Sequence, residues 1–155
     1  MIPKTYLALV ADDSEDEQIL ISRFLRSVPR FKLIGSLHDG AETVSYLRGA
    51  CGFGDRTKFP YPDLLLLDYQ MPGLNGMEVL TLLEFEKTRP RVVLWSNVPE
   101  LMDEELALRL GADLICRKPS DAFELNAIID RLEWPAVAPS VPSLSPESSI
   151  HEWRA

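Results

Sequence analysis

The sequence predicts an α/β fold built on one parallel β-sheet. Short apolar runs alternate with segments of helical spacing five times along the chain. The runs at 6–11 and 64–67 carry no charged residue and no period of two, which is typical of strands covered on both faces. Repeated β-α units of this kind imply right-handed crossovers and helices on both sides of the sheet.

The clearest strand is the run of four leucines at 64–67, which Asp68 follows directly. A proline, two glycines and Asn75 come within the next eight residues and predict a turn-rich loop. Open α/β sheets place ligands and chemistry at the carboxyl ends of their strands. Asp68 is therefore a candidate functional residue, since Asn75 is better placed to cap a helix that starts near Gly76.

Four further strands are predicted from similar apolar runs, at 6–11, 32–37, 92–95 and 114–116. Helices are predicted between the strands, where apolar residues recur every three or four positions. Proline and glycine mark the ends of several of these helices. The predicted helices are 14–28, 41–47, 76–87, 99–110 and 123–132, and a long loop is expected at 49–62.

Caps and a buried face are predicted for individual helices. Ser14 or Asp13 is expected to cap the first helix, and Ser120 the last. The first helix is expected to bury an apolar stripe, made of Leu20, Phe24 and Val28 with Ile21 and Leu25 beside it.

The length of 155 residues suits one domain with a substantial core. Helical periodicity ends at Leu132, and the remainder is rich in proline and serine. We therefore expect a domain at 1–132 and a flexible tail at 133–155. Because a tail of this size is too short for one, we expect no DNA-binding or catalytic domain after Leu132.

Charge and cysteine content narrow the function classes. The net charge of −8 disfavours binding to nucleic acid or to anionic membranes. Cys51 and Cys116 lie far apart without CxxC spacing, which indicates neither a disulfide framework nor a zinc site. The N-terminal apolar run is too short for a signal peptide or a membrane span. A cytoplasmic location is therefore expected.

The residues that follow the strands should meet at the shared carboxyl edge of the sheet. Three carboxylates brought together there repel one another, and a divalent cation that prefers oxygen ligands, such as Mg²⁺, would compensate their charge. With an ammonium and a hydroxyl, this set suits the transfer of a phosphoryl group to a carboxylate. The residues are Asp12 and Asp13 after the first strand, Asp68 after the third, Ser96 after the fourth and Lys118 after the fifth.

Each of these residues has a simpler explanation when taken alone. Asp12 and Asp13 could serve only as a helix cap with an acidic flank, Ser96 as a solvated hydroxyl, and Lys118 as a surface lysine. Their common place at the ends of strands favours the functional interpretation.

The chain resembles a receiver domain of two-component response regulators, from about Thr5 to Leu132. The matching motifs are ADD at 11–13, LLLLDYQMPGLNG at 64–76, WS at 95–96, GAD at 111–113 and RKPS at 117–120. The resemblance implies a flavodoxin-like, doubly wound (βα)5 fold with strand order 2-1-3-4-5. It suggests the single-domain, chemotaxis-regulator-like or phytochrome-associated type, and the long loop at 49–62 points to the last of these.

The resemblance also implies a role for each matching residue. Asp68 would accept the phosphoryl group, Lys118 would pair with Asp68 and then with the phosphoryl oxygens, and Ser96 would move to bind the phosphoryl group. Pro119 would follow Lys118 through a cis peptide bond. The ligands of Mg²⁺ would be Asp13, Asp68, the backbone carbonyl of Gln70 and, through water, Asp12.

Three positions depart from the family pattern. Ile115 stands where an aromatic switch residue is usual, which puts the coupling to Ser96 in doubt. Asn97 is larger than the small residue that commonly follows Ser96. Val98 cannot orient an attacking water, so we expect slow loss of the phosphoryl group, although Gln70 could serve instead.

The expected function is a stand-alone phosphoacceptor switch, not an enzyme with a separate substrate. Its donor would be a sensor histidine kinase or a histidine phosphotransfer protein, and its output would be contact with a protein target or relay of the phosphate. A homodimer is possible for such a domain. A pseudo-receiver that only binds partners is one alternative. The other is a phosphatase of the haloacid dehalogenase type, which would want a second aspartate where Gln70 stands.

Overall fold

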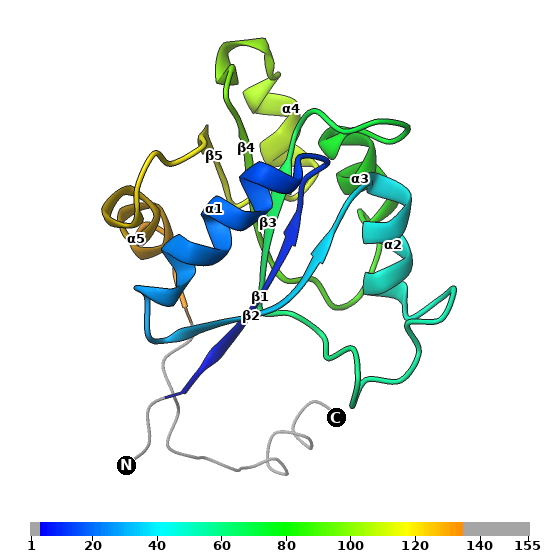
Figure 1. The fold of residues 1–155 in the computed structure, drawn as a ribbon. Coiled ribbons are helices and arrows are strands. Elements are labelled where there is room, and N and C mark those ends of the chain that lie inside the picture. The colour runs from blue at the N-terminus through cyan, green and yellow to red at the C-terminus, as the bar shows by residue number, and fades with distance from the viewer. Residues whose placement is uncertain (1–3, 135–155) are drawn as a thin grey trace, which may run out of the picture.

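A computed structural model describes residues 4–134 as one β-sheet between two layers of helices (Figure 1). The helices α1 and α5 cover one face of the sheet, and α2 and α3 cover the other. The elements are β1 (Tyr6–Ala11), α1 (Glu15–Arg26), β2 (Phe31–Leu37), α2 (Gly40–Arg48), β3 (Leu64–Asp68), α3 (Gly76–Leu82), β4 (Arg91–Ser96), the 3-10 helix η1 (Pro99–Leu101), α4 (Glu104–Arg109), β5 (Leu114–Arg117) and α5 (Ala122–Asp130).

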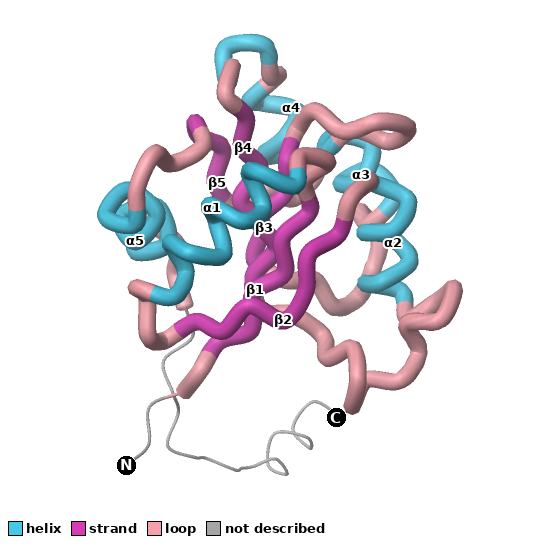
Figure 2. The backbone as a smooth tube through the Cα atoms, in the orientation of Figure 1, coloured by secondary structure: helices cyan, strands magenta, loops and turns pink. Residues whose placement is uncertain are grey.

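The five strands are all parallel and lie in the order β2-β1-β3-β4-β5. Figure 2 shows the strands side by side, with β3 at the centre. This is the flavodoxin-like order that the sequence motifs implied. Because every strand runs the same way, all five carboxyl ends lie at one edge of the sheet.

The leucines of β3 explain why its sequence shows no alternation. Leu65 and Leu67 belong to the apolar core that also contains side chains of α2, α3 and α4. Leu64 and Leu66 belong to the opposite core, with side chains of α1 and α5. All four leucines are fully buried. A strand that is covered on both faces has no position for a polar side chain until Asp68 ends it.

The apolar stripe predicted for α1 is confirmed for three of its five residues. Ile21, Leu25 and Val28 are buried, whereas Leu20 is 43% exposed and Phe24 is only half-buried. The buried residues and the more exposed pair both have helical spacing, so periodicity alone could not show which of them face the core. Gln18 is buried on the same helix as Ile21 and Leu25, and its side chain donates to the carbonyls of Asp12 and Leu37.

Two of the predicted helices differ most from the structure. The helix predicted at 76–87 ends at Leu82, because Glu86 and Lys87 occupy the positions that would continue the buried stripe from Leu83. The helix predicted at 99–110 is divided into η1 and α4. Asp103 begins α4 as a new helix, since its side chain accepts from the N–H of Leu106 at 3.1 Å.

The start of α5 corrects two further expectations. Asp121, not Ser120, caps the helix and accepts from the N–H of Glu124. Ser120 instead donates its own N–H to the Glu124 carboxylate. No peptide bond within residues 4–134 is cis, so the Lys118–Pro119 bond is trans, the intrinsically favoured isomer of a bond to proline.

The expected loop at 49–62 is ordered around Arg56. The guanidinium donates to the carbonyls of Tyr46, Leu47 and Phe59 at 2.9–3.2 Å. It therefore adds a donor to two carbonyls in the last turn of α2 and joins that turn to the loop at Phe59. The rings of Phe53 and Phe59 pack against each other and against Tyr46.

The packed domain extends two residues beyond the predicted boundary at 132. Trp134 lies against the rings of Tyr6 and Phe31, with centroid distances of 4.7 and 5.3 Å. The carbonyl of Glu133 accepts from the Arg91 side chain. The rest of the predicted tail lies outside the described residues. Within the part of the chain that is described, no helix has the length and apolar character needed to cross a bilayer.

Candidate functional site

The predicted site residues lie at the carboxyl edge of the sheet, and backbone hydrogen bonds fix the loop that carries Asp68. Asp68 is the last residue of β3, and the next N–H, that of Tyr69, donates to the carbonyl of Trp95 on β4. The carbonyl of Tyr69 accepts from the N–H of Gly76 at the start of α3. The turn after Asp68 is thus held from both sides.

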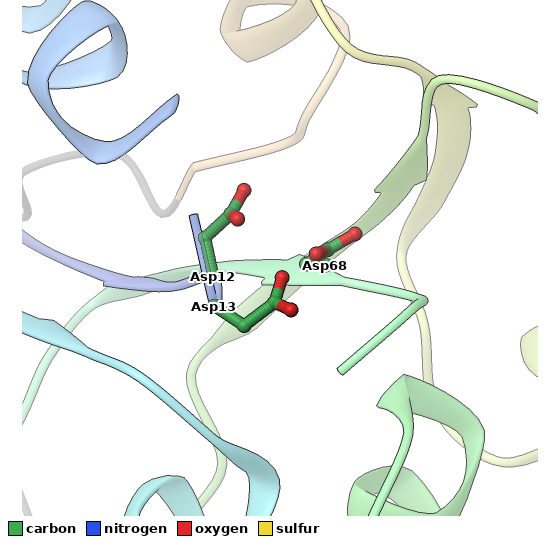
Figure 3. A group of neighbouring side chains, drawn as sticks. All are labelled: Asp12, Asp13 and Asp68. Atoms are coloured by element: carbon green, nitrogen blue, oxygen red, sulfur yellow. The ribbon is translucent and has the colours of Figure 1, made fainter. Parts of the chain in front are cut away.

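Asp12, Asp13 and Asp68 form a cluster of carboxylates. One oxygen from each lies within 4.8 Å of the other two. Figure 3 shows Asp12 and Asp13 leaving consecutive positions after β1, with the carboxylate of Asp13 near that of Asp68. Asp12 and Asp68 are buried and Asp13 is exposed. Three carboxylate oxygens beside open solvent are a donor set that suits Mg²⁺, which prefers oxygen ligands and keeps several waters.

Lys118 is the cation that the structure supplies to this cluster. Its Nζ lies 2.8 Å from Asp12 Oδ2 and 3.4 Å from Asp68 Oδ1, and its side chain is only 7% exposed. The shorter contact is with Asp12, whereas the sequence resemblance pointed to Asp68 as the partner. Asp68 Oδ1 also accepts a hydrogen bond from the N–H of Gln70 at 3.2 Å, so Lys118 and Gln70 both contact this oxygen.

Burial and charge act in opposite directions on the two central groups. Burial raises the pKa of Asp68 to about 6; the charge of Lys118 opposes this shift and that of Asp12 adds to it. For Lys118, burial alone would lower the pKa. The hydrogen bond to Asp12 and the charges of Asp68, Asp12 and Glu17 outweigh burial and raise it. Lys118 is therefore a fixed ammonium at neutral pH.

The cluster borders an open polar pocket of about 380 Å³. The lining residues are Asp12, Asp13, Ser14, Glu17, Asp68, Gln70, Asn97 and Lys118. The pocket thus contains five of the six predicted site residues. The sixth, Ser96, is buried and does not line it. Its carbonyl accepts from the N–H of Lys118, and its hydroxyl oxygen accepts from the N–H of Val98 at 2.9 Å.

Two residues at this edge were missed by the sequence reasoning. Glu17 Oε1 lies 3.6 Å from Lys118 Nζ, although its sequence position indicated only an acidic first turn of a helix. Arg117 donates to the carbonyl of Asn97 at 2.5 Å and lies 3.5 Å from the Glu100 carboxylate. No local pattern in the sequence pairs these residues, because Lys118, just after β5, contacts α1, and Arg117, at the end of β5, contacts the segment between β4 and α4. Ile115, at the usual aromatic position, is half-buried against the core.

Comparison with known proteins agrees with this geometry. Residues 8–130 match the family model of the response regulator receiver domain. The chain belongs to this family. Receiver domains act in two-component signalling and interact with histidine kinases or phosphotransfer proteins. The family binds Mg²⁺ or Mn²⁺ at an acidic cluster, which in this receiver is formed by Asp12, Asp13 and Asp68.

Individual relatives and solved structures agree with this family assignment. A protein-glutamate methylesterase/protein-glutamine glutaminase of Halalkalibacterium halodurans is 32% identical over 144 residues, which cover 90% of this chain and 38% of the relative. The response regulator domain of Thermotoga maritima CheB is 29% identical, with a TM-score of 0.65, over 83% of this chain and 96% of that one. The phosphorylated cyanobacterial phytochrome response regulator RcpA is 25% identical, with a TM-score of 0.68, over 82% and 90%.

The methylesterases are much longer than the region that matches. This chain spans 38% of the Halalkalibacterium relative and 33% of a second one, from Geobacillus kaustophilus. The CheB structure, in contrast, is covered almost completely, and it is the response regulator domain alone. The similarity thus identifies a receiver domain.

Proposed function

We propose that this receiver accepts a phosphoryl group on Asp68 in a Mg²⁺-dependent reaction and changes its protein contacts in response. The position of Lys118 is the main support. Its ammonium lies 3.4 Å from Asp68 Oδ1, at the edge where Asp12 and Asp13 complete a group of three carboxylates. A buried nucleophile, a fixed cation and an oxygen-rich metal site are the parts that phosphoryl transfer needs.

Asp68 acts as the nucleophile toward a phosphohistidine. A carboxylate oxygen attacks phosphorus, the O–P bond forms as the P–N bond breaks, and the electron pair of the broken bond goes to the imidazole. Asp13, Asp68, the carbonyl of Gln70 and, through water, Asp12 would hold Mg²⁺, and the bound ion would supply positive charge to the phosphoryl oxygens. Lys118 binds one of these oxygens directly.

Ser96 contributes a hydroxyl proton. Its oxygen already accepts from the N–H of Val98, so its own O–H remains available as a donor. Movement of Ser96 toward the phosphoryl group would pull on this hydrogen bond and on the start of η1. Ile115 does not provide a ring to follow that movement, so we propose that the response passes through the β4–α4 loop itself.

The phosphoryl donor is a sensor histidine kinase or a histidine phosphotransfer protein, and the output is contact with a protein target or onward relay. We propose no turnover of a separate substrate. The chain assists only its own phosphorylation and dephosphorylation. The methylesterase activity of the relatives is not part of the proposal, because the similarity covers about a third of those proteins.

The test compares the wild type with Asp68→Asn. Both proteins are treated with acetyl phosphate and Mg²⁺ and analysed by mass, and beryllofluoride binding is followed by tryptophan fluorescence. Trp95 is a suitable probe because it is buried in β4 beside Ser96. We expect one added phosphoryl group and a fluorescence change in the wild type, and neither in Asp68→Asn.

Other outcomes would identify the alternatives. Turnover of a phosphomonoester would indicate a phosphatase. A wild type that takes up neither acetyl-phosphate-derived phosphoryl nor beryllofluoride would be a pseudo-receiver that only binds partners.

A further inference from the structure

Glu17 is a fourth carboxylate at the phosphoacceptor pocket. It lies on the first turn of α1, lines the pocket and places Oε1 3.6 Å from Lys118 Nζ. Its side chain is 30% exposed, so it lies at the rim, whereas Asp12 and Asp68 lie deeper. The function proposed above assigns it no role.

The local sequence would normally give Glu17 a different partner. Ser14 and Glu17 have the spacing of a capping box, in which the glutamate accepts from the N–H of the cap residue. The complete motif forms in α3, where the Glu78 carboxylate accepts from the N–H of Asn75 at 2.9 Å. In α1 only half of it forms, and the Ser14 side chain accepts from the N–H of Glu17.

Asp12 is the reason that the second half is missing in α1. Its Oδ1 accepts from the N–H of Ser14 at 2.9 Å and so takes the donor that a capping box would give to Glu17. The Glu17 carboxylate is thereby released from the helix end. It contacts Lys118, which belongs to the segment after β5, across the mouth of the pocket.

The charge of Glu17 has opposite effects on the two ligands of the pocket. It attracts a divalent cation and repels a phosphoryl group. It also competes with phosphoryl oxygens for Lys118, whose ammonium already contacts Asp12 and Asp68. The charge of Glu17 should therefore strengthen Mg²⁺ binding and weaken phosphoryl binding, compared with a pocket that has only the aspartates and Lys118.

We propose that Glu17 is a positioning residue that holds Lys118 in the unmodified receiver and opposes entry of the phosphoryl group. This inference rests on the phosphoacceptor function proposed above. Glu17 must give up its contact when Lys118 turns to the phosphoryl oxygens. Its removal should make the modified state easier to reach.

The experiment compares Glu17→Gln with Glu15→Gln. Glu15 lies in the same first turn and is exposed, so the control removes an equal charge from the helix end without touching the pocket. Titration calorimetry measures Mg²⁺ affinity, and tryptophan fluorescence measures beryllofluoride affinity at saturating Mg²⁺. NMR of the metal-free protein measures the pKa of Lys118, to which the charge of Glu17 contributes an upward shift.

We expect opposite changes in the two affinities. Glu17→Gln should bind beryllofluoride roughly three- to tenfold more tightly and Mg²⁺ a few-fold more weakly, as removal of one charge a few ångströms away predicts. The pKa of Lys118 should fall in Glu17→Gln, and Glu15→Gln should match the wild type in all three measurements.

The outcomes separate this inference from the function on which it rests. If the wild type binds beryllofluoride but Glu17→Gln matches Glu15→Gln, the role of Glu17 is refuted and the phosphoacceptor function stands. A variant that binds both ligands more weakly would show that Glu17 only supports the fold. If the wild type binds no beryllofluoride, the phosphoacceptor function is refuted, and the proposed effect of Glu17 on phosphoryl entry is refuted with it.

Discussion

Burial has a larger effect on the chemistry of Asp68 than any single neighbouring charge. Asp68 is 4% exposed, and desolvation raises the pKa of its carboxyl group to about 6 against the opposing effect of Lys118. A carboxylate that is costly to keep ionised is a better nucleophile and a readier metal ligand than a solvated one. The free-energy cost of ionising the buried carboxyl group should be measurable as a loss of folding stability.

The stability of the metal-free protein should depend on pH through Asp68. The ordinary carboxyl pKa is 3.8 and the folded value is about 6, so between these values the folded state binds more protons than the unfolded chain. The free energy of unfolding therefore falls as pH rises through this window. At pH 8 in EDTA, Asp68→Asn should be more stable than the wild type by roughly 1–3 kcal/mol.

Urea unfolding at pH 4 and pH 8 checks this prediction. The advantage of Asp68→Asn should disappear at pH 4, where the wild-type carboxyl is protonated in the folded state. Glu84→Gln, at an exposed position, serves as the control for a general charge effect. An Asp68→Asn variant that is less stable than the wild type at pH 8 would contradict the assigned burial cost.

Val98 should slow the loss of the phosphoryl group. Its side chain is apolar and cannot orient an attacking water, although its N–H contacts the Ser96 hydroxyl. Val98→Glu is expected to hydrolyse the phosphorylated form faster than the wild type, measured by mass after removal of the donor. Leu101→Glu introduces the same acid at an exposed position on η1 and should leave the rate unchanged. A slower Val98→Glu would refute the assignment.

At the level of elements, the start of α3 sets the position of Asp68. A Cβ on Gly76 would lie 2.7 Å from the carbonyl oxygen of Asp68 and 2.6 Å from Leu94 Cδ1. The first of these is a backbone atom that cannot turn aside. Only glycine lets α3 begin this close to the end of β3, and the N–H of Gly76 closes the turn on Tyr69.

Gly76→Ala should therefore damage both stability and function. We expect a loss of roughly 1–3 kcal/mol in the free energy of unfolding, typical of overpacking, together with weaker beryllofluoride binding. Thr81→Ala, at an exposed position on the same helix, should change neither. Normal beryllofluoride affinity in Gly76→Ala would show that the Asp68 turn does not depend on this close approach.

The strands and their order could be predicted because each depends on a property visible in the sequence. Uninterrupted apolar runs mark buried strands, and the motif around Asp68 identifies the family. Helix ends were harder to predict, because neighbouring side chains can each cap the same helix. Ser120 and Asp121 both can cap α5, and the choice depends on where the chain leaves β5. The contact of Glu17 with Lys118 was not predicted for the same reason. Asp12 accepts from the N–H of Ser14, which the sequence position of Glu17 suggested as the partner of Glu17.

At the scale of the whole molecule, Trp134 joins the segment after α5 to the first two strands. Its ring contacts Tyr6 on β1 and Phe31 at the start of β2, and its indole N–H donates to the carbonyl of Ile129. Trp134 thus completes an aromatic cluster at the edge of the sheet opposite Asp68. This cluster stabilises the fold without touching the phosphoacceptor pocket.

Trp134→Ala should lower stability and leave the pocket intact. We expect a loss of roughly 1–3 kcal/mol in urea unfolding, less than for a fully buried tryptophan because Trp134 is only half-buried. Phe123→Ala removes a ring that is 81% exposed and should cost little. Mg²⁺ affinity should be unchanged in both folded variants. A Trp134→Ala variant as stable as Phe123→Ala would show that Trp134 adds no stability to the packed domain.

The contact between Asp12 and Lys118 joins residues 106 positions apart in the chain. During synthesis, all three aspartates leave the ribosome well before the lysine does. Until β5 has docked beside β4, the acidic residues have no ammonium to balance them. An unfinished chain thus lacks the ammonium that we propose binds the incoming phosphoryl group, and a kinase would meet a competent acceptor only after nearly the whole domain has been made.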